Sequence, residues 1–192
     1  MTQQSATTFT CPWWLIFTFD NPLRKLAQNP KKILGPYVKA GSTVLDVGCG
    51  MGYFSLGLAE LVGENGKVIA ADLQPEMLAG LSKRAKAAKL ESRINSQLST
   101  PDKIGVSEPV DFALAFWMVH EVRKREEFLR EIFSTLKPGG KFLIVEPLIH
   151  VSGQDFERTV TLSHEIGFTT GVRPRVSMSR AILLEKKKTG AE

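Results

Sequence analysis

The chain has 192 residues, which is enough for one domain with a full hydrophobic core and slightly short for two. Its 43% hydrophobic and 23% charged residues are typical of a globular protein and exclude fibrous, low-complexity and disordered classes. The net charge of +5 permits weak attraction to nucleic acid or to an anionic membrane, but the basic residues are scattered over separate predicted elements, so we expect solvated faces there.

The N-terminal part is marked by one apolar run, FTCPWWLIFTF at 9–19. It is shorter than the roughly 20 residues needed to span a bilayer, and it lacks the basic start and cleavage site of a secretion signal. Residues 1 to about 40 are expected to form one or two short helices beside the first strand. Two cysteines, Cys11 and Cys49, are too few for a disulfide framework or a thiolate metal site, and a reduced, cytoplasmic setting is expected.

From residue 42 onward, short β-branched runs alternate with segments of helical period, which predicts a parallel sheet covered by helices. The predicted strands are 43–47, 67–72, 94–98, 110–116 and 141–146.

Four helices are predicted between and after these strands. The first presents Phe54, Leu58, Leu61 and Val62 on one face; the second begins near Pro75 and turns Leu78, Leu81 and Ala85 inward. The third presents Phe128, Leu129, Ile132, Phe133 and Leu136 and stops at KPGG; the fourth opens with Ser152 and Asp155 in capping-box spacing and ends at Gly167.

Two strand-like runs follow within 168–186 with no helix between them, so they are expected to pair antiparallel. The predicted fold is therefore α/β: a single domain with a doubly wound, mostly parallel seven-stranded sheet and an antiparallel hairpin at one edge.

The stretch VLDVGCGMGYF, at 44–54, ends the first strand with glycines at every second position. A dinucleotide fingerprint has the different spacing G-x-G-x-x-G, and Asp46, two residues before Gly48, would repel a pyrophosphate. The pattern therefore favours a ligand that lacks phosphate and has positive charges of its own. Ligands of open α/β sheets lie outside the carboxyl ends of the strands, where Asp46, Asp72, Phe116 and Glu146 are expected to surround one crevice.

This stretch resembles motif I of the class I S-adenosylmethionine-dependent methyltransferases, D/E-x-G-x-G-x-G. The resemblance continues through VIAADLQPEML, DFALAFWMVHEV and LKPGGKFLIVEP, in family order and at normal spacing, and covers about residues 37–186. The sequences WMVHEV and VEP within the last two blocks are similar to those of the broad small-molecule (type 11-like) family that includes quinone and sterol enzymes. The resemblance implies a Rossmann-like methyltransferase fold, methyltransferase activity and S-adenosylmethionine as cofactor.

The cofactor site that the resemblance implies is formed by Asp46, Gly48, Cys49, Gly50, Asp72, Leu73, Thr100 and Phe116. Asp72 can accept two hydrogen bonds from the ribose cis-diol, and Leu73 is expected to pack against the adenine. Related enzymes carry an aspartate after the third strand that contacts the adenine amine. This chain has Thr100 there, and either Ser99 or Asp102 is an alternative.

Methyl transfer depends mainly on positioning and on exclusion of water, and a base is needed only when the acceptor must first lose a proton. The candidates are His120, Glu121, Glu146 and His150, of which His120 is the best placed; its alternative role is a hydrogen bond within the loop. His150 and His164 are interpreted as surface or packing residues. The three histidines have no metal-ligand spacing, so no metal is expected.

The acceptor is expected to be a small molecule, and an apolar one is favoured. The chain lacks the N/D-P-P-Y/F motif of enzymes that methylate nucleobase amines, and it lacks the several cysteines of arsenite enzymes. Trp13, Trp14, Phe17 and Trp117 are the candidate pocket residues. Alternatively, the N-terminal aromatics form a strap on the sheet or a foot in a membrane interface. An RNA methyltransferase and a non-catalytic S-adenosylmethionine-binding regulator remain alternative functions, although nucleic acid is not the expected partner.

Overall fold

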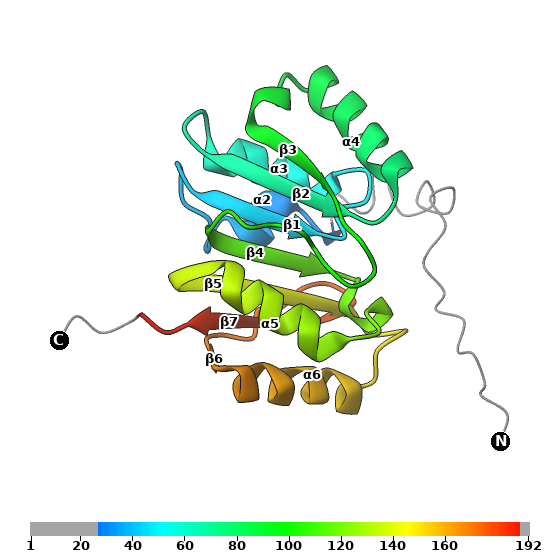
Figure 1. The fold of residues 1–192 in the computed structure, drawn as a ribbon, viewed down its shortest axis with the longest axis vertical. Helices are drawn as coiled ribbons and strands as arrows, with labels where there is room; N and C mark the ends of the chain where they lie inside the picture. The colour runs from blue at the N-terminus through cyan, green and yellow to red at the C-terminus, as the bar shows by residue number, and fades with distance from the viewer. Residues whose placement is uncertain (1–26, 189–192) are drawn as a thin grey trace, which may run out of the picture.

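Strands and helices alternate along the chain and build one seven-stranded sheet (Figure 1). The computed structural model describes residues 27–188. Its strands are β1 (Thr43–Val47), β2 (Lys67–Asp72), β3 (Ile94–Leu98), β4 (Val110–Phe116), β5 (Leu136–Pro147), β6 (Phe168–Thr170) and β7 (Ser179–Lys186). Their order across the sheet is β3-β2-β1-β4-β5-β7-β6. β1 to β5 pair in parallel, whereas β7 pairs antiparallel with both β5 and β6, so the predicted fold class is confirmed.

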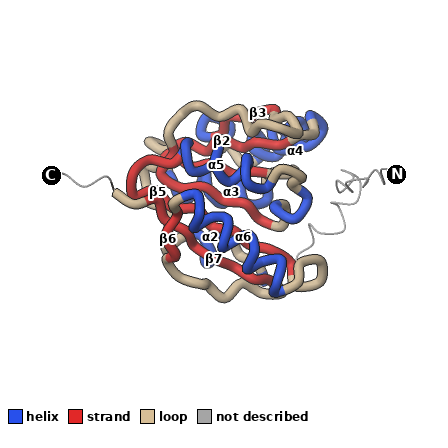
Figure 2. The backbone as a smooth tube through the Cα atoms, turned by 60° about the horizontal axis from the view of Figure 1, so that its bottom comes forward, coloured by secondary structure: helices blue, strands red, loops and turns tan. Residues whose placement is uncertain are grey.

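Helices cover both faces of this sheet, as Figure 2 shows with strands in red and helices in blue. They are α2 (Pro30–Leu34), α3 (Tyr53–Val62), α4 (Pro75–Ala87), α5 (Arg125–Thr135) and α6 (Gly153–Ile166). Because side chains alternate along a strand, each strand feeds two cores. On one face, residues such as Val44 and Leu143 pack against α2 and α3; on the other, residues such as Leu45 and Ile144 pack against α5 and α6. No helix within residues 27–188 combines the length and apolarity needed to cross a membrane.

The helix boundaries follow from local chemistry. Pro75 occupies the first turn of α4, where its missing N–H costs no hydrogen bond. The Ser152 hydroxyl caps α6 by accepting a hydrogen bond from the Asp155 backbone N–H at 3.1 Å. Gly167 ends α6 with a φ of 118°, which glycine adopts without the steric cost that a Cβ would add. The predicted start and end of this helix are confirmed.

One predicted detail is wrong. Leu136 is not the last residue of the third helix but the first residue of β5, where it pairs with Val110. Pro138 cannot continue a helix and Gly139 has a φ of 79°, so KPGG lies inside an irregular strand start and shifts the register of β5 against β4. In α4, Leu78 is partly buried and packs against the core cluster of Cys49, Ala70 and Leu81, as the sequence predicted.

Met77, which the sequence analysis did not name, is also buried, with 1% of its surface exposed. Met77, Leu81 and Ala85 are four residues apart and lie on one stripe of the helix, and Leu78 lies at the margin of that stripe.

Candidate active site

The strand order reverses between β1 and β4, and loops of the candidate site leave the sheet at the carboxyl ends of these strands. β1 and β2 contribute the glycine loop and Asp72 on one side. β4 and β5 contribute residues 116–121 and 146–150 on the other side. The fold thus gathers segments that are about 100 residues apart in the sequence at one edge of the sheet.

The glycine loop after β1 adopts a backbone that disfavours any other residue. Gly48, Gly50 and Gly52 have φ values of 65°, 54° and 82°. A Cβ on Gly48 would lie 2.9 Å from the Cγ of Met118, which follows β4. The Gly48 N–H donates to the carbonyl of Ala71 in β2 at 2.8 Å, so the loop is tied to the neighbouring strand. At these three positions the loop therefore requires a residue without a Cβ, and at Gly48 this lets the loop pack closely against Met118.

Two buried carboxylates support this loop. Asp46 is 2% exposed and accepts a hydrogen bond from the Ser55 hydroxyl of α3 at 2.6 Å. Asp72 accepts from the Gly50 N–H at 2.8 Å through Oδ2 and from the Gln74 N–H at 3.0 Å through Oδ1. Burial raises the pKa of Asp72, although these backbone donors oppose the shift. The Leu73 N–H also donates to this carboxylate, which with about four lone-pair sites on its two oxygens keeps acceptor capacity for a ligand.

Cys49 lies between these two carboxylates and is not chemically activated. Burial raises the pKa of its thiol well above the usual value, and the charges of Asp46 and Asp72 raise it further. A neutral, buried thiol is a poor nucleophile and a poor metal ligand. Among the residues that the structure describes, no group of three or more His, Cys, Asp and Glu could hold a metal ion.

Exposed apolar side chains lie beside Asp72. Leu73 follows Asp72 directly and is 44% exposed. Leu98, which pairs with Asp72 in the β2–β3 register, is 54% exposed. An apolar surface next to a hydrogen-bond acceptor suits a flat ring joined to a polyhydroxylated group.

The three alternatives for the residue after β3 have different surroundings. The Thr100 side chain is exposed and bonds within its own turn, accepting from the Lys103 N–H at 3.1 Å. The Ser99 hydroxyl donates to the Ile104 carbonyl at 3.0 Å. Asp102 pairs with Lys124 at 3.1 Å.

Aromatic residues continue from α3 into the crevice at the end of β4. Phe116 packs against Phe54 with ring centroids 4.1 Å apart, and Trp117 follows with a left-handed φ of 60°. The Trp117 indole N–H donates to the Ser179 hydroxyl at the start of β7, at 2.9 Å. A strained backbone at a large side chain is a feature of functional sites. The other three predicted pocket residues, Trp13, Trp14 and Phe17, lie outside the described residues.

His120 is hydrogen-bonded to Glu146. The His120 Nδ1 lies 2.7 Å from the Oε2 of Glu146, a carboxylate of which only 3% of the side-chain surface is exposed. Burial by itself lowers the pKa of His120, but the hydrogen bond and charge of Glu146, together with the charge of Glu121, outweigh it, and the pKa is raised. The His150 ring lies parallel to the His120 ring at 6.1 Å. His164 is remote from this pair and bonds to Thr170.

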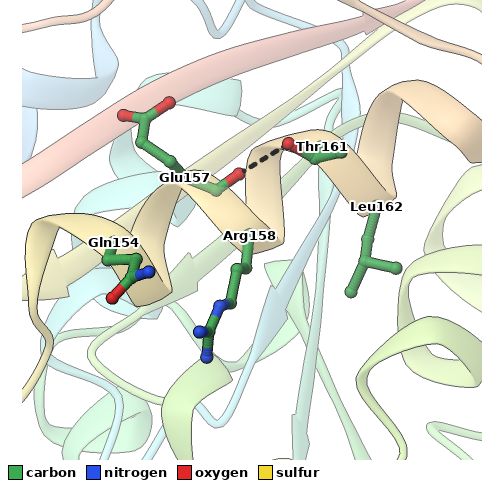
Figure 3. Close-up of a pocket in the computed structure, with 5 residues that line it drawn as sticks. All are labelled: Gln154, Glu157, Arg158, Thr161 and Leu162. Carbon is green, nitrogen blue, oxygen red and sulfur yellow. Dashed lines mark hydrogen bonds between the residues drawn. The ribbon is translucent and has the colours of Figure 1, made fainter.

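A hollow on the surface of α6 lies apart from the crevice (Figure 3). All five residues that line it come from this one helix: Gln154, Glu157, Arg158, Thr161 and Leu162. A single helix cannot enclose a ligand, and none of the predicted site residues is among them.

Comparison with known proteins identifies the family to which this geometry belongs. A family model described as a methyltransferase domain matches residues 38–168. The chain belongs to this methyltransferase family. A solved structure of an S-adenosylmethionine-dependent methyltransferase from Aquifex aeolicus is 26% identical and superposes with a TM-score of 0.81, covering 92% of this chain and 99% of that one. The chain is therefore a class I methyltransferase, and S-adenosylmethionine is its cofactor.

Curated relatives of this methyltransferase have different named activities. The carboxy-S-adenosyl-L-methionine synthase of Pseudoalteromonas atlantica is 28% identical over 136 residues, which are 70% of this chain and 56% of that protein. The demethylmenaquinone methyltransferase of Lactobacillus johnsonii is 33% identical over 112 residues, which are 57% of this chain and 45% of that protein. The methyltransferase spans about half the length of the curated relatives that it matches.

Several residues at this methyltransferase's site escaped the sequence reasoning. Ser55 and Met118 touch the motif I loop, but neither has a pattern that would have revealed this before the elements were placed in space. Leu148, Ile149 and Met178 form an exposed apolar group at the ends of β5 and β7. Exposed apolar residues in predicted loops were the available signal for this group.

Proposed function

We propose that this methyltransferase transfers a methyl group to a small apolar acceptor. The observation that carries the proposal is the apolar rim formed by Leu148, Ile149 and Met178, which are 49%, 76% and 58% exposed. The Leu148 N–H donates to the Met178 carbonyl at 3.0 Å, so the two loops of the rim are joined. Exposed apolar side chains next to a polar crevice are typical of binding sites for apolar ligands.

The position of the rim supports an acceptor site over a cofactor site. Leu148 and Ile149 follow Glu146 closely in the chain, on the β5 side of the crevice, whereas the glycine loop and Asp72 lie on the β1 and β2 side. Trp117 and Met178 both have left-handed backbones, with φ values of 60° and 57°. Such strain persists only where the surrounding structure holds it, which favours a functional surface here.

The opposite side of the crevice would hold the cofactor, which supplies a methyl group on a positively charged sulfur. The bare backbone at Gly48 and Gly50 would admit its methionine part, with Asp46 and Cys49 supporting the loop. Asp72 would accept from the ribose hydroxyls, and Leu73 would face the adenine. We assign Phe116 to the boundary between the two sides, and Thr100 stays a candidate for the adenine amine.

The relatives give this proposal limited support. The Lactobacillus johnsonii protein is named for an apolar quinone substrate, but it is 33% identical and more than twice as long as the matched part. The rim residues of this chain, and not the relative's name, are therefore what the experiment should test.

The test compares Ile149→Asp with Val172→Asp. Both residues are exposed and apolar. Val172, however, lies beside the middle of β7, where its carbonyl accepts a hydrogen bond from the Leu183 N–H at 2.8 Å, away from the rim. With 2-naphthol, 2-aminonaphthalene, glycine and an RNA oligonucleotide as acceptors, we expect methylation of a naphthalene compound. We also expect Ile149→Asp to raise the KM for that compound by about tenfold, roughly the effect of one lost apolar contact surface.

The control Val172→Asp should leave this KM unchanged. Preferential methylation of glycine or RNA, or equal effects of the two substitutions, would contradict the proposed function.

A further inference from the structure

Glu146 makes three hydrogen bonds to one short segment, the 3₁₀ turn η3 (Val119–Glu121). Its Oε1 accepts from the Val119 N–H at 3.0 Å, and its Oε2 accepts from the His120 N–H at 3.1 Å and contacts the His120 Nδ1 at 2.7 Å. The carboxylate at the end of β5 therefore fixes both the backbone and the ring of His120, which follows β4.

This contact pattern determines which ring nitrogen of His120 bears the proton. Both Glu146 oxygens act as acceptors toward η3, because each accepts a backbone N–H group, and we therefore take the ring nitrogen at 2.7 Å as the donor. Neutral His120 then has its proton on Nδ1 and its lone pair on Nε2. The Nε2 atom lies 4.0 Å from the nearest Glu121 oxygen, which is beyond hydrogen-bond distance.

The charges around His120 make its ring a stronger base than an ordinary histidine. Glu146 from β5 and Glu121 from η3 raise the pKa of the ring against its burial, and Arg125 from α5 lowers it. His150 stacks on the ring from the loop after β5, and Asp155 from α6 is near enough for His120 to lower the pKa of its carboxyl. Together, burial and these charges leave the pKa of His120 above the usual value for histidine.

From this geometry we infer that the acceptor is a hydroxyl-bearing aromatic molecule, with His120 Nε2 taking the hydroxyl proton and Glu146 acting as the positioning residue. The inference rests on the proposed function and narrows its substrate class. In the transfer, the acceptor O–H bond breaks and its proton moves to Nε2. The oxygen forms a bond to the methyl carbon while the methyl–sulfur bond breaks, and the electron pair of that bond stays on sulfur. An aromatic hydroxyl needs this help because its neutral form is a weak nucleophile, whereas a neutral amine already has a free lone pair.

The first experiment measures the His120 tautomer by ¹⁵N NMR of the ring in the protein without acceptor. We expect a proton on Nδ1 in the unmodified protein. Glu146→Gln, which keeps the size of the side chain but offers an amide, should lower the pKa of His120 and reduce this tautomer. The matched variant Glu121→Gln also removes a nearby charge and lowers the pKa, but it should keep the tautomer because Glu121 makes no hydrogen bond to the ring at 4.0 Å. A proton on Nε2 in the unmodified protein would overturn the inference.

The second experiment compares 2-naphthol with 2-aminonaphthalene, which share one ring system and differ in the nucleophile. With 2-naphthol, kcat should rise with pH through the raised pKa of His120, because only the neutral ring accepts a proton. His120→Gln should lower this kcat by about 10²- to 10⁴-fold and abolish the pH dependence, and Glu146→Gln should lower it by about tenfold. Calorimetric affinity for S-adenosylhomocysteine should stay unchanged in both variants, which shows that they are folded.

The outcomes separate the two proposals. Methylation of 2-aminonaphthalene but not of 2-naphthol, or a His120→Gln enzyme that methylates 2-naphthol at the normal rate, would overturn the inference and leave the apolar acceptor intact. Methylation of neither naphthalene compound, with the cofactor bound, would overturn the proposed function and this inference with it.

Discussion

At the scale of single residues, the sharpest expectation concerns Asp72. Asp72→Asn replaces one acceptor oxygen by an amide donor, which would face the Gly50 or Gln74 N–H. A hydrogen bond to a charged group contributes about 1.5–3 kcal/mol, so calorimetry should show S-adenosylhomocysteine binding weakened by roughly 10- to 100-fold. Affinity of the unmodified protein should fall on acidification as the carboxyl with the raised pKa takes up its proton, and the variant should lose this dependence.

The control for this prediction is Asp102→Asn. Asp102 is an exposed carboxylate paired with Lys124 at 3.1 Å, and such surface pairs contribute little, so the affinity should change by less than about twofold. A larger loss in Asp102→Asn than in Asp72→Asn would contradict the assignment and would point to Asp102 as the adenine contact.

The sequence was informative about residues whose type is required by the local backbone conformation. It was much less informative about residues whose role depends on a side-chain contact with a distant part of the chain. Glycine spacing and an acid at a strand end locate Gly48, Gly50 and Asp72 without coordinates, because only certain residues suit those positions. The hydrogen bond between His120 and Glu146 joins the turn η3 to the end of β5, across 26 residues of sequence. Both were named from the sequence as separate candidate bases, and only the distance between them assigns one as the partner of the other.

At the scale of elements, the contact between the glycine loop and α4 can be tested by a glycine-to-alanine substitution, which adds one methyl group to the loop. A Cβ on Gly52 would lie 2.1 Å from the Leu81 Cδ1, whereas a Cβ on Gly41 would meet nothing within 4 Å. The two glycines have nearly the same φ, 82° and 80°, so alanine strains the backbone equally at both, by about 1–2 kcal/mol. Gly52→Ala should cost about 1–3 kcal/mol more in the free energy of unfolding, measured in urea, because it also overpacks the core.

Equal losses for Gly41→Ala and Gly52→Ala would mean that Leu81 moves aside at no cost, and that α4 does not hold the loop in place.

Periodicity placed most elements correctly and failed where two patterns overlap. Leu136 continues the apolar stripe of α5 yet starts β5, because Pro138 and the left-handed Gly139 end the helix one residue before it. The antiparallel pairing of β6 and β7 was predictable from the missing helix between them. The place of this pair at one edge of the sheet was also predicted and is confirmed. The order within the pair was not predicted: β7 lies next to β5, and β6 is outermost. That choice depends on long-range pairing, which local sequence does not encode.

At the scale of the whole molecule, we assign the cofactor and the acceptor to two different halves of the sheet. Figure 1 shows β1, β2 and β3 with α3 and α4 in one half of the sheet, and β4, β5 and β7 in the other half. Strand order alone places this division, since the winding reverses between β1 and β4. The proposed cofactor residues lie in the first half, and the proposed acceptor rim lies in loops of the second half; loops are where proteins of one fold commonly differ in function.

This division predicts the pattern of amide hydrogen exchange on adding S-adenosylhomocysteine. We expect slower exchange in residues 48–53 and 72–74, where the glycine loop and Asp72 would contact the ligand, because bound ligand reduces local opening. Residues 147–151 and 176–179, which include the apolar rim, should exchange as before, since they are assigned to the acceptor. Mass spectrometry of peptides from the two halves measures both sets in one sample. Protection confined to 147–151 and 176–179 would reverse the assignment of the two sides, and equal protection of all four segments would mean that the cofactor alone closes the crevice.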